Sequence, residues 1–170
     1  MEIRAITLSD SRAFLDLLLR LDNETKFMMF EPGERDSSEK LIENHLSNLS
    51  ESIGAFIGAF EHEVCVGFIS ISRGCTNRAK HSAYVVMGVA SSFTGKGIGK
   101  LLFAEGEAWA KKHNITRLEL TVMTHNINAL KLYEKMGFEN EGLKKNSLLV
   151  DGNYVDEYYM GKIFEGGIAK

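Results

Sequence analysis

The stretch Thr94-Gly95-Lys96-Gly97-Ile98-Gly99-Lys100 decides the fold, because it joins a β-rich segment to a segment with helical periodicity. A glycine-rich turn at the start of a helix gathers backbone N–H groups and the positive end of the helix dipole around one point. Glycine leaves those amides accessible and tolerates the positive φ angles that such a turn requires. We therefore predict that Thr94–Lys100 binds a phosphate group. The alternative is a flexible loop whose glycines only cap the helix.

Two other phosphate-binding motifs are tested by their spacing. A Walker A loop requires a glycine five residues before its Gly-Lys pair and a hydroxyl after it, but Thr94 and Leu101 occupy these positions. The dinucleotide fingerprint requires a third glycine where Lys100 stands. Glu119 follows about 20 residues downstream, where a ribose-binding acid belongs, and keeps an oxidoreductase as a minor alternative.

A second motif follows downstream, Asn126-x-x-Ala129-Leu130-x-Leu132-Tyr133-x-x-x-Gly137-Phe138. Its pattern predicts a helix from Asn126 to Met136, with Gly137 just past its last turn. Asn126 and Tyr133 are seven residues apart, which places them on one face of a helix. Asn126 also suits a helix N-cap, and Tyr133 also suits a core aromatic position.

The rest of the chain extends this strand–turn–helix unit in both directions. Alternation and β-branched residues predict strands at Ile3–Ile6, Ala55–Glu61, Val64–Ser72, His81–Val89, Arg117–Val122, from Phe138 onward, and Tyr154–Met160. Further helices are predicted after the Thr7/Asp10 capping pair, around Leu41–Leu49, and over Gly97–His113. This order predicts a single α/β (α+β) domain over residues 1–170, with a mixed central sheet of about seven strands and helices on both faces.

Composition narrows the class of protein. The 170 residues are 44% hydrophobic and 25% charged with a formal net charge of −3, which gives no basic footprint for nucleic acid. The longest apolar runs, such as Tyr84–Ala90, are too short to span a membrane. Cys65 and Cys75 have no metal-ligand spacing, and the N-terminal sequence lacks a signal-peptide pattern. We expect a cytoplasmic protein that needs no metal.

Together, the two motifs resemble the GNAT N-acetyltransferase superfamily, with a match from about Tyr84 to Phe138. Met87-Gly88-Val89 followed by Thr94-x-x-Gly97-x-Gly99 is similar to the strand and pyrophosphate loop of that family, and the helix motif is similar to the family's Asn…Tyr…Gly-Phe helix. The resemblance implies the GNAT fold, acetyl-coenzyme A as co-substrate, and acetyl transfer to a primary amine.

The resemblance also assigns roles to individual residues. It implies that Met87 and Val89 pair with the pantetheine arm and that the Met87 amide faces the thioester carbonyl. The loop amides of Gly95, Lys96, Gly97, Ile98, Gly99 and Lys100 would hold the pyrophosphate. Asn126 would lie near pantetheine, and Tyr133 beside the coenzyme sulfur, where its hydroxyl would protonate the leaving thiolate.

Two residues depart from the family pattern. Thr94 replaces a Gln or Arg, so only backbone contacts to the pyrophosphate are expected from that position. Ala83 stands where well-studied members carry a glutamate base. Only about one alkylamine molecule in 2,500 is neutral at pH 7, so a proton acceptor is needed, and His81 on the same strand is the candidate. Water or an acidic loop residue is the alternative to it.

Acidic side chains offer a site for the cation of the acceptor. Glu24, Glu31 and Glu34 fall where the family's substrate loop lies; the alternative, a solvated acidic loop, explains them better. The tail from Glu141-Gly142 to Asp151-Gly152-x-Tyr154-x-Asp156 resembles the branch with ribosomal-protein and polyamine acetyltransferases.

The acceptor and the oligomeric state stay open at this level. The acceptor would be a small-molecule amine or a protein N-terminal or lysine amine, and a homodimer is compatible with the sequence. The rival hypothesis is a non-catalytic acetyl-CoA sensor or structural domain. The absence of a glutamate at Ala83 favours that rival, whereas the intact Tyr133 opposes it.

Overall fold

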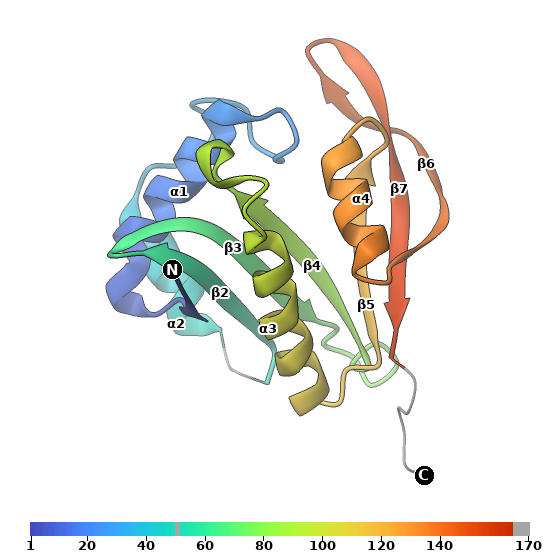
Figure 1. The fold of residues 1–170 in the computed structure, drawn as a ribbon, viewed down its shortest axis with the longest axis horizontal. Coiled ribbons are helices and arrows are strands. Elements are labelled where there is room, and N and C mark those ends of the chain that lie inside the picture. Colours follow the sequence, from blue (N-terminus) through green and yellow to red (C-terminus); the bar gives the residue numbers. More distant parts are fainter. Residues whose placement is uncertain (50–51, 165–170) are drawn as a thin grey trace.

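One mixed sheet organises the protein in the computed structural model, which describes residues 1–49 and 52–164 (Figure 1). The seven strands lie in the order β1-β2-β3-β4-β5-β7-β6. They are β1 (Glu2–Ala5), β2 (Gly54–Glu61), β3 (Val64–Arg73), β4 (Ser82–Val89), β5 (Arg117–Met123), β6 (Glu139–Val150) and β7 (Asn153–Ile163). The helices are α1 (Ser11–Glu24), α2 (Glu39–Asn48), α3 (Ile98–Lys112) and α4 (Ile127–Lys135), with short 3-10 turns η1 (Leu8–Asp10) and η2 (Ser91–Phe93).

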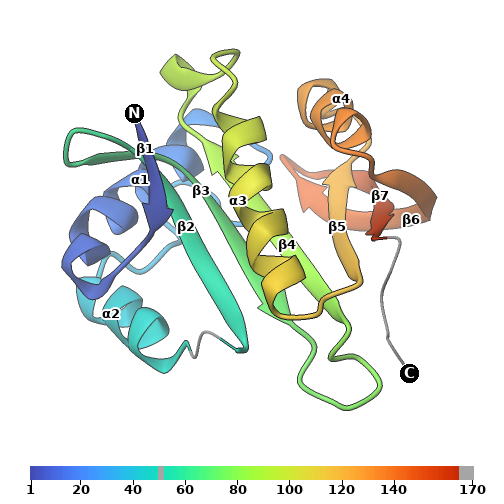
Figure 2. The ribbon, with the colours of Figure 1, turned by 60° about the horizontal axis from the view of Figure 1, so that its bottom comes forward.

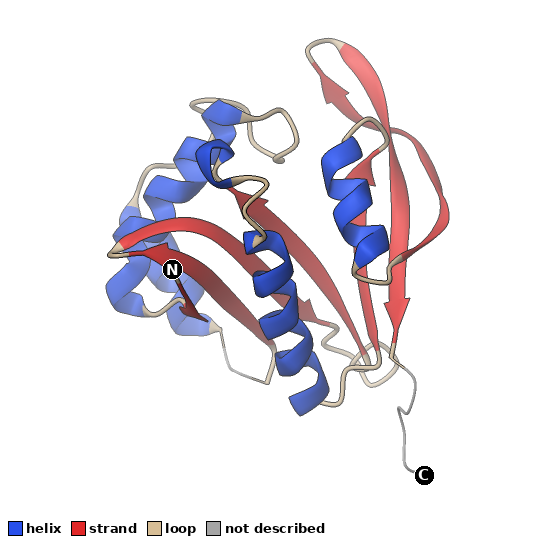
Figure 3. Ribbon diagram, viewed as in Figure 1, coloured by secondary structure: helices blue, strands red, loops and turns tan. Residues whose placement is uncertain are grey.

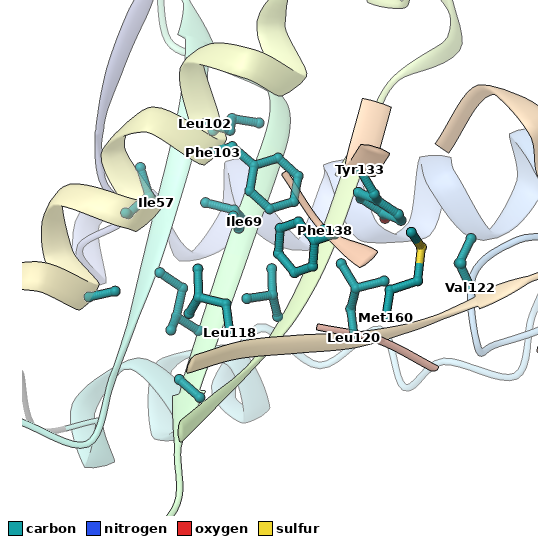
Figure 4. Packing of buried hydrophobic residues seen from close by; sticks show 14 of the residues in the cluster. Ile57, Ile69, Leu102, Phe103, Leu118, Leu120, Val122, Tyr133, Phe138 and Met160 are labelled. Atoms are coloured by element: carbon teal, nitrogen blue, oxygen red, sulfur yellow. The ribbon is translucent and has the colours of Figure 1, made fainter. Parts of the chain in front are cut away.

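Helices cover both faces of this sheet, as the sequence predicts (Figure 2, Figure 3). Side chains from α3 and α4 pack on one face in a core that includes Phe103, Leu118 and Met160. The other face packs against α1 and α2 in a second core that includes Phe14 and Phe68. The α3/α4 core is shown in Figure 4.

Local sequence signals account for most element boundaries. The Thr7/Asp10 capping box is present, but it opens the short turn η1, and α1 begins only at Ser11. Asp10 accepts hydrogen bonds from Arg4 at 2.7 and 2.8 Å, and this guanidinium holds the carboxyl pKa well below its usual range. In α2, the helix predicted around Leu41–Leu49, Ile42 is buried whereas Leu41 is 44% exposed.

The C-terminal strands form a long hairpin. Asp151 and Gly152 both have positive φ angles, 50° and 76°, as the turn of a tight hairpin requires. The hairpin places β7 between β5 and β6, antiparallel to both. Thus β7, the last strand of the described residues, becomes the neighbour of β5.

The sheet opens between β4 and β5. These two parallel strands pair only from Ser82 opposite Arg117 to Tyr84 opposite Glu119. Beyond Tyr84, β4 stays paired with β3 through Val89, and β5 stays paired with β7 through Met123. The facing edges of β4 and β5 therefore separate, as the diverging ribbons in Figure 1 show. Within the described ranges, none of the helices is long and apolar enough to cross a membrane.

Candidate functional site

A cleft of about 1080 Å³ occupies the opening between β4 and β5. Its walls come from β4 and β5, the turn before α3, one face of α4, and the connection between α1 and α2. It is lined from both sides of the sheet, since Phe68 belongs to the α1/α2 core and Tyr133 to the α3/α4 core. Two ligands that enter from opposite faces can therefore meet where the strands part.

The edge of β4 presents unpaired backbone groups to this cleft. The His81 carbonyl accepts hydrogen bonds from the Thr116 N–H, just before β5, at 2.8 Å and from the Arg117 N–H of β5 at 3.2 Å, whereas the Ala90 N–H bonds to Val66 of β3 at 2.9 Å. Backbone polar groups of successive strand residues point to opposite edges, so odd-numbered residues share the orientation of His81. Met87 and Val89 therefore direct their N–H and C=O groups into the cleft, where β5 no longer pairs with them.

The glycine-rich turn supplies a row of free amides. Gly95 and Gly97 have φ angles of 75° and 82°, which confirms the predicted need for left-handed backbone, and Gly97 is the N-cap of α3. Within the described chain, the N–H groups of residues 95–99 donate no backbone hydrogen bond; the first such donors are Lys100 and Leu101, both to the Gly97 carbonyl. Five successive free amides at a helix N-terminus have the arrangement that suits an anion.

Side chains around the turn hold it in place. The Thr94 hydroxyl donates to the Ser91 carbonyl at 2.8 Å, so this side chain serves its own turn. Ile98 is buried in the α3/α4 core, and the Lys96 ammonium lies 4.6 Å from the Phe93 ring centroid. Lys100 lies beside Lys135, and this neighbouring positive charge lowers the pKa of Lys100.

Glu24 contributes to this support. Its carboxylate accepts a hydrogen bond from the Ser91 N–H at 2.7 Å and another from Arg20 at 2.5 Å, and the Ser91 bond is the main reason that its pKa is lowered. Both of its oxygens are thus occupied. Glu31 and Glu34 are exposed and lie outside the cleft lining, where the Glu34 carboxylate accepts from the Glu31 N–H. The three predicted acceptor-binding acids are therefore not free groups of the cleft.

Helix α4 brings Asn126 and Tyr133 to the same cleft, in agreement with their predicted common face. The Asn126 side chain accepts a hydrogen bond from the Ala129 N–H at 3.2 Å, so it does cap the helix. Tyr133 is 8% exposed and packs edge-on against Phe103, with ring centroids 5.7 Å apart (Figure 4). Burial raises the pKa of Tyr133 to about 12. Tyr133 lines the cleft, and its hydroxyl has no hydrogen-bond partner within residues 1–49 and 52–164.

The structure does not bring His81 to this site. His81 directly precedes β4, at the end where β4 and β5 are still paired, and it is exposed and outside the cleft lining. Met87 lies six residues further along, roughly 20 Å at the rise of a strand. Ala83 is buried in the α3/α4 core, so no polar group replaces the missing glutamate there.

Sequence reasoning missed Glu157. This residue of β7 is 6% exposed, lies opposite Met123 of β5, and lines the cleft. Ser147 donates a hydrogen bond to its Oε2 at 2.5 Å, and the Lys144 ammonium lies 3.6 Å from the same oxygen. The sequence does show an acidic residue within the predicted strand Tyr154–Met160. It does not show which strand pairs with that segment, so the position of Glu157 beside the cleft could not be predicted.

The connection between α1 and α2 reaches across the cleft. Lys26 forms an ion pair with Asp151 in the β6–β7 turn, and the Phe27 ring lies 5.3 Å from the His125 ring. Arg35 anchors the connection through the buried carboxylate of Asp22, at 2.5 and 3.0 Å. Phe27 and Phe30 of this connection line the cleft.

The two cysteines lack the features of a catalytic nucleophile. Burial raises the pKa of the Cys65 thiol to about 12, so it stays protonated, and Cys75 is exposed away from the cleft. Among the residues that the structure describes, no cluster of three or more His, Cys, Asp or Glu side chains has the geometry to hold a metal ion.

Sequence comparison identifies relatives for this arrangement. Residues 15–138 match the model of the Acetyltransferase (GNAT) family. The chain is 35% identical over 102 residues to the L-amino acid N-acetyltransferase AaaT of Escherichia coli, covering 58% of this chain and 61% of that protein, less than two thirds of its length. It is 29% identical over 121 residues to the spermidine N(1)-acetyltransferase of Thermoplasma acidophilum, covering 71% and 73% of the two chains.

Solved structures share the whole fold. A GNAT-family acetyltransferase from Streptococcus pneumoniae superposes with a TM-score of 0.91 at 28% identity, covering 96% of this chain and 99% of that one. The Salmonella typhimurium protein yncA, solved with its cofactor acetyl-CoA, has the same fold with a TM-score of 0.87 at 15% identity, covering 100% and 97%. The predicted resemblance and fold class are both confirmed.

Proposed function

The chain belongs to the acetyltransferase (GNAT) family, and from that premise we propose that it transfers an acetyl group from acetyl-CoA to a primary amine. The observation that carries the proposal is the row of five free amides at residues 95–99, all of which except Lys96 line the same cleft as the free edge of β4 and Tyr133. In one cleft, the free amides fit the pyrophosphate of a coenzyme A thioester, the free strand edge fits its pantetheine arm, and the tyrosine acid fits its sulfur.

The coenzyme would lie along β4. The free amides of residues 95–99 would receive the pyrophosphate, since helix N-termini bind phosphates. The peptide-like pantetheine arm would add to the edge of β4 through the backbone of Met87 and Val89, in the manner of an extra strand. Asn126 would approach the same arm with its amide N–H₂, because its oxygen is committed to capping α4.

The chemistry would proceed by direct attack. A neutral amine adds to the thioester carbonyl, and the Met87 N–H stabilises the resulting oxyanion. The carbon–sulfur bond then breaks, and the Tyr133 hydroxyl gives its proton to the thiolate and regains one from the new amide nitrogen through water. With a pKa of about 12, Tyr133 keeps its proton at neutral pH and is available as this acid.

Water in the open cleft would remove the amine proton. The sequence offered His81 for this step, but its position outside the cleft supports water instead. The rate would then follow the fraction of free amine, because the pKa of an alkylamine is about 10.4.

We expect log(kcat/KM) for the amine to rise by one unit per pH unit from pH 6 to 9, with superimposed profiles for wild type and His81→Ala. A histidine base would instead produce a limb near its reference pKa of about 6.5. Steady-state kinetics at saturating acetyl-CoA measures the profile. A plateau above pH 7 that His81→Ala abolishes would return the role of base to His81.

We also expect acetyl-CoA to stabilise the native protein. A ligand at a hundredfold excess over its Kd adds about 2.7 kcal/mol, which corresponds to a rise of about 5 to 10 °C in Tm for a chain of this size. Thermal denaturation with acetyl-CoA, and with NAD as control, tests it. An equal shift with NAD, or none with millimolar acetyl-CoA, would contradict the proposed ligand.

A sensor or structural domain that binds acetyl-CoA without turnover is the second candidate, and the buried Ala83 in place of a glutamate favours it. Release of free thiol from acetyl-CoA separates the two functions. The names of the relatives suggest amino acids and spermidine as the first acceptors to assay.

A further inference from the structure

The half of the cleft on the α1/α2 face is mostly apolar, with Glu157 as a buried acid. Its lining includes the side chains Phe27, Met28, Phe30, Phe56, Phe68 and Leu148. Tyr158 and Met160 of β7 pack in the α3/α4 core, so Glu157, one residue before Tyr158, points to the opposite face. Glu157 thus places a carboxylate in the half of the cleft opposite to Tyr133.

One oxygen of this carboxylate is unoccupied. Ser147 and Lys144 both contact Oε2, and within the described chain no group bonds to Oε1. Oε1 is not among the described side-chain atoms that are both buried and without a partner, so it is accessible from the cleft and open to a ligand. Met123 also lines the cleft and pairs with Glu157, so the backbones of these two residues lie one strand spacing, roughly 5 Å, apart.

The other charged groups of this half are already paired. Glu24 binds Ser91 and Arg20, and Arg35 binds Asp22. Lys100 belongs to the turn before α3, on the coenzyme side, and His45 is an exposed residue of α2. Among the described residues, the Lys144 ammonium lies 3.6 Å from Glu157 Oε2 and the Arg35 guanidinium binds Asp22, so both cations already face carboxylates, whereas Glu157 Oε1 is a free anionic oxygen.

We propose that Glu157 Oε1 binds the ammonium group of the acceptor, and that the acceptor is an arylalkyl monoamine without a carboxylate. This inference rests on the proposed acetyl transfer for its biological use. Four phenylalanine rings and the methionine provide the surface for an aromatic body. The carboxylate of a free amino acid would be desolvated there without a partner, and the additional charges of a polyamine would lack acids. The specificity would therefore differ from that in the names of both sequence relatives.

Binding to the protein saturated with free CoA tests the inference, because no acetyl group is present to transfer. The probes are 2-phenylethylamine, its neutral isostere 2-phenylethanol, and L-phenylalanine, which adds only a carboxylate. The variants are Glu157→Gln and, as control, Glu119→Gln, a carboxylate of β5 that pairs with Arg117 outside the large cleft. Calorimetry gives each Kd, and thermal denaturation with acetyl-CoA checks the fold and the coenzyme site.

We expect the Kd of 2-phenylethylamine to rise about tenfold or more in Glu157→Gln, as for loss of a hydrogen bond to a charged group. In Glu119→Gln, the Kd of 2-phenylethylamine should stay within twofold of its wild-type value. In Glu157→Gln, the Kd of 2-phenylethanol and the affinity for acetyl-CoA should also stay within twofold of wild type. Wild type should bind L-phenylalanine at least tenfold more weakly than the amine.

An unchanged amine Kd in a folded Glu157→Gln, or equal binding of amine and L-phenylalanine, would overturn the inference. If Glu157→Gln does not fold, equal wild-type binding of the amine and the alcohol overturns it, and a tenfold preference for the amine supports it. Amine binding that depends on Glu157, together with no thiol release from acetyl-CoA, would sustain this site and reject the proposed function.

Discussion

Tyr133→Phe is expected to lower kcat by at least tenfold while leaving the fold and the coenzyme affinity intact. The change keeps the ring that packs against Phe103 and Phe138 and deletes only the hydroxyl. General-acid assistance is typically worth 10²- to 10⁴-fold, or about 3 to 5 kcal/mol of barrier, although water replaces part of it. Because that hydroxyl has no partner in the described chain, its removal should change Tm very little.

A matched control is Tyr158→Phe. Tyr158 packs against the same core from β7 but does not line the cleft, so the loss of its hydroxyl should leave kcat within twofold of wild type. Steady-state kinetics, acetyl-CoA titration and thermal denaturation are measured on both variants. Wild-type kcat in Tyr133→Phe would reject the acid role and leave Tyr133 as a core aromatic.

Gly97→Val is expected to weaken acetyl-CoA binding by about 10- to 150-fold, the cost of losing one hydrogen bond to a charged group. At a φ of 82°, a β-branched residue is strongly disfavoured, so the turn must shift and its free amides must lose their alignment. A Cβ at this position would meet no atom within 4 Å, so the effect would come from the backbone and not from a clash.

Gly152→Val is the matched control for backbone strain. Gly152 has a φ of 76°, and a Cβ added to it would also meet nothing within 4 Å, but it lies in the β6–β7 turn. Both variants should lose about 1 to 2 kcal/mol of stability, and only Gly97→Val should lose coenzyme affinity. Near-normal acetyl-CoA affinity in a folded Gly97→Val would contradict the anion cradle at residues 95–99.

Gly99 obeys a different constraint from that of Gly97. The sequence predicts that the glycines of the turn let a phosphate approach the amides and permit positive φ angles. In the structure, a Cβ on Gly99 would lie 2.7 Å from Leu132 of α4 and 3.4 Å from Met87 of β4. Gly99 therefore allows α3, α4 and β4 to converge at the cleft, which a single sequence does not reveal.

The sequence alone determined the parts of this protein that depend on neighbours along the chain. The positive φ angles at Gly95 and Gly97, the common face of Asn126 and Tyr133, and the Asp151-Gly152 hairpin all follow from local backbone geometry and helical or strand periodicity. The same periodicities, taken in order, were enough to predict a seven-stranded mixed sheet with helices on both faces.

Only the tertiary structure decided which side chains meet in the cleft. The separation of β4 from β5 after Tyr84 leaves His81 at the paired end of the strand, outside the cleft, while Met87 and Val89 face into it. The pairing of β7 with β5 brings Glu157 beside Met123, 34 residues earlier in the chain. Strand partners are fixed by long-range hydrogen bonding and core packing, which the period of a single strand does not encode.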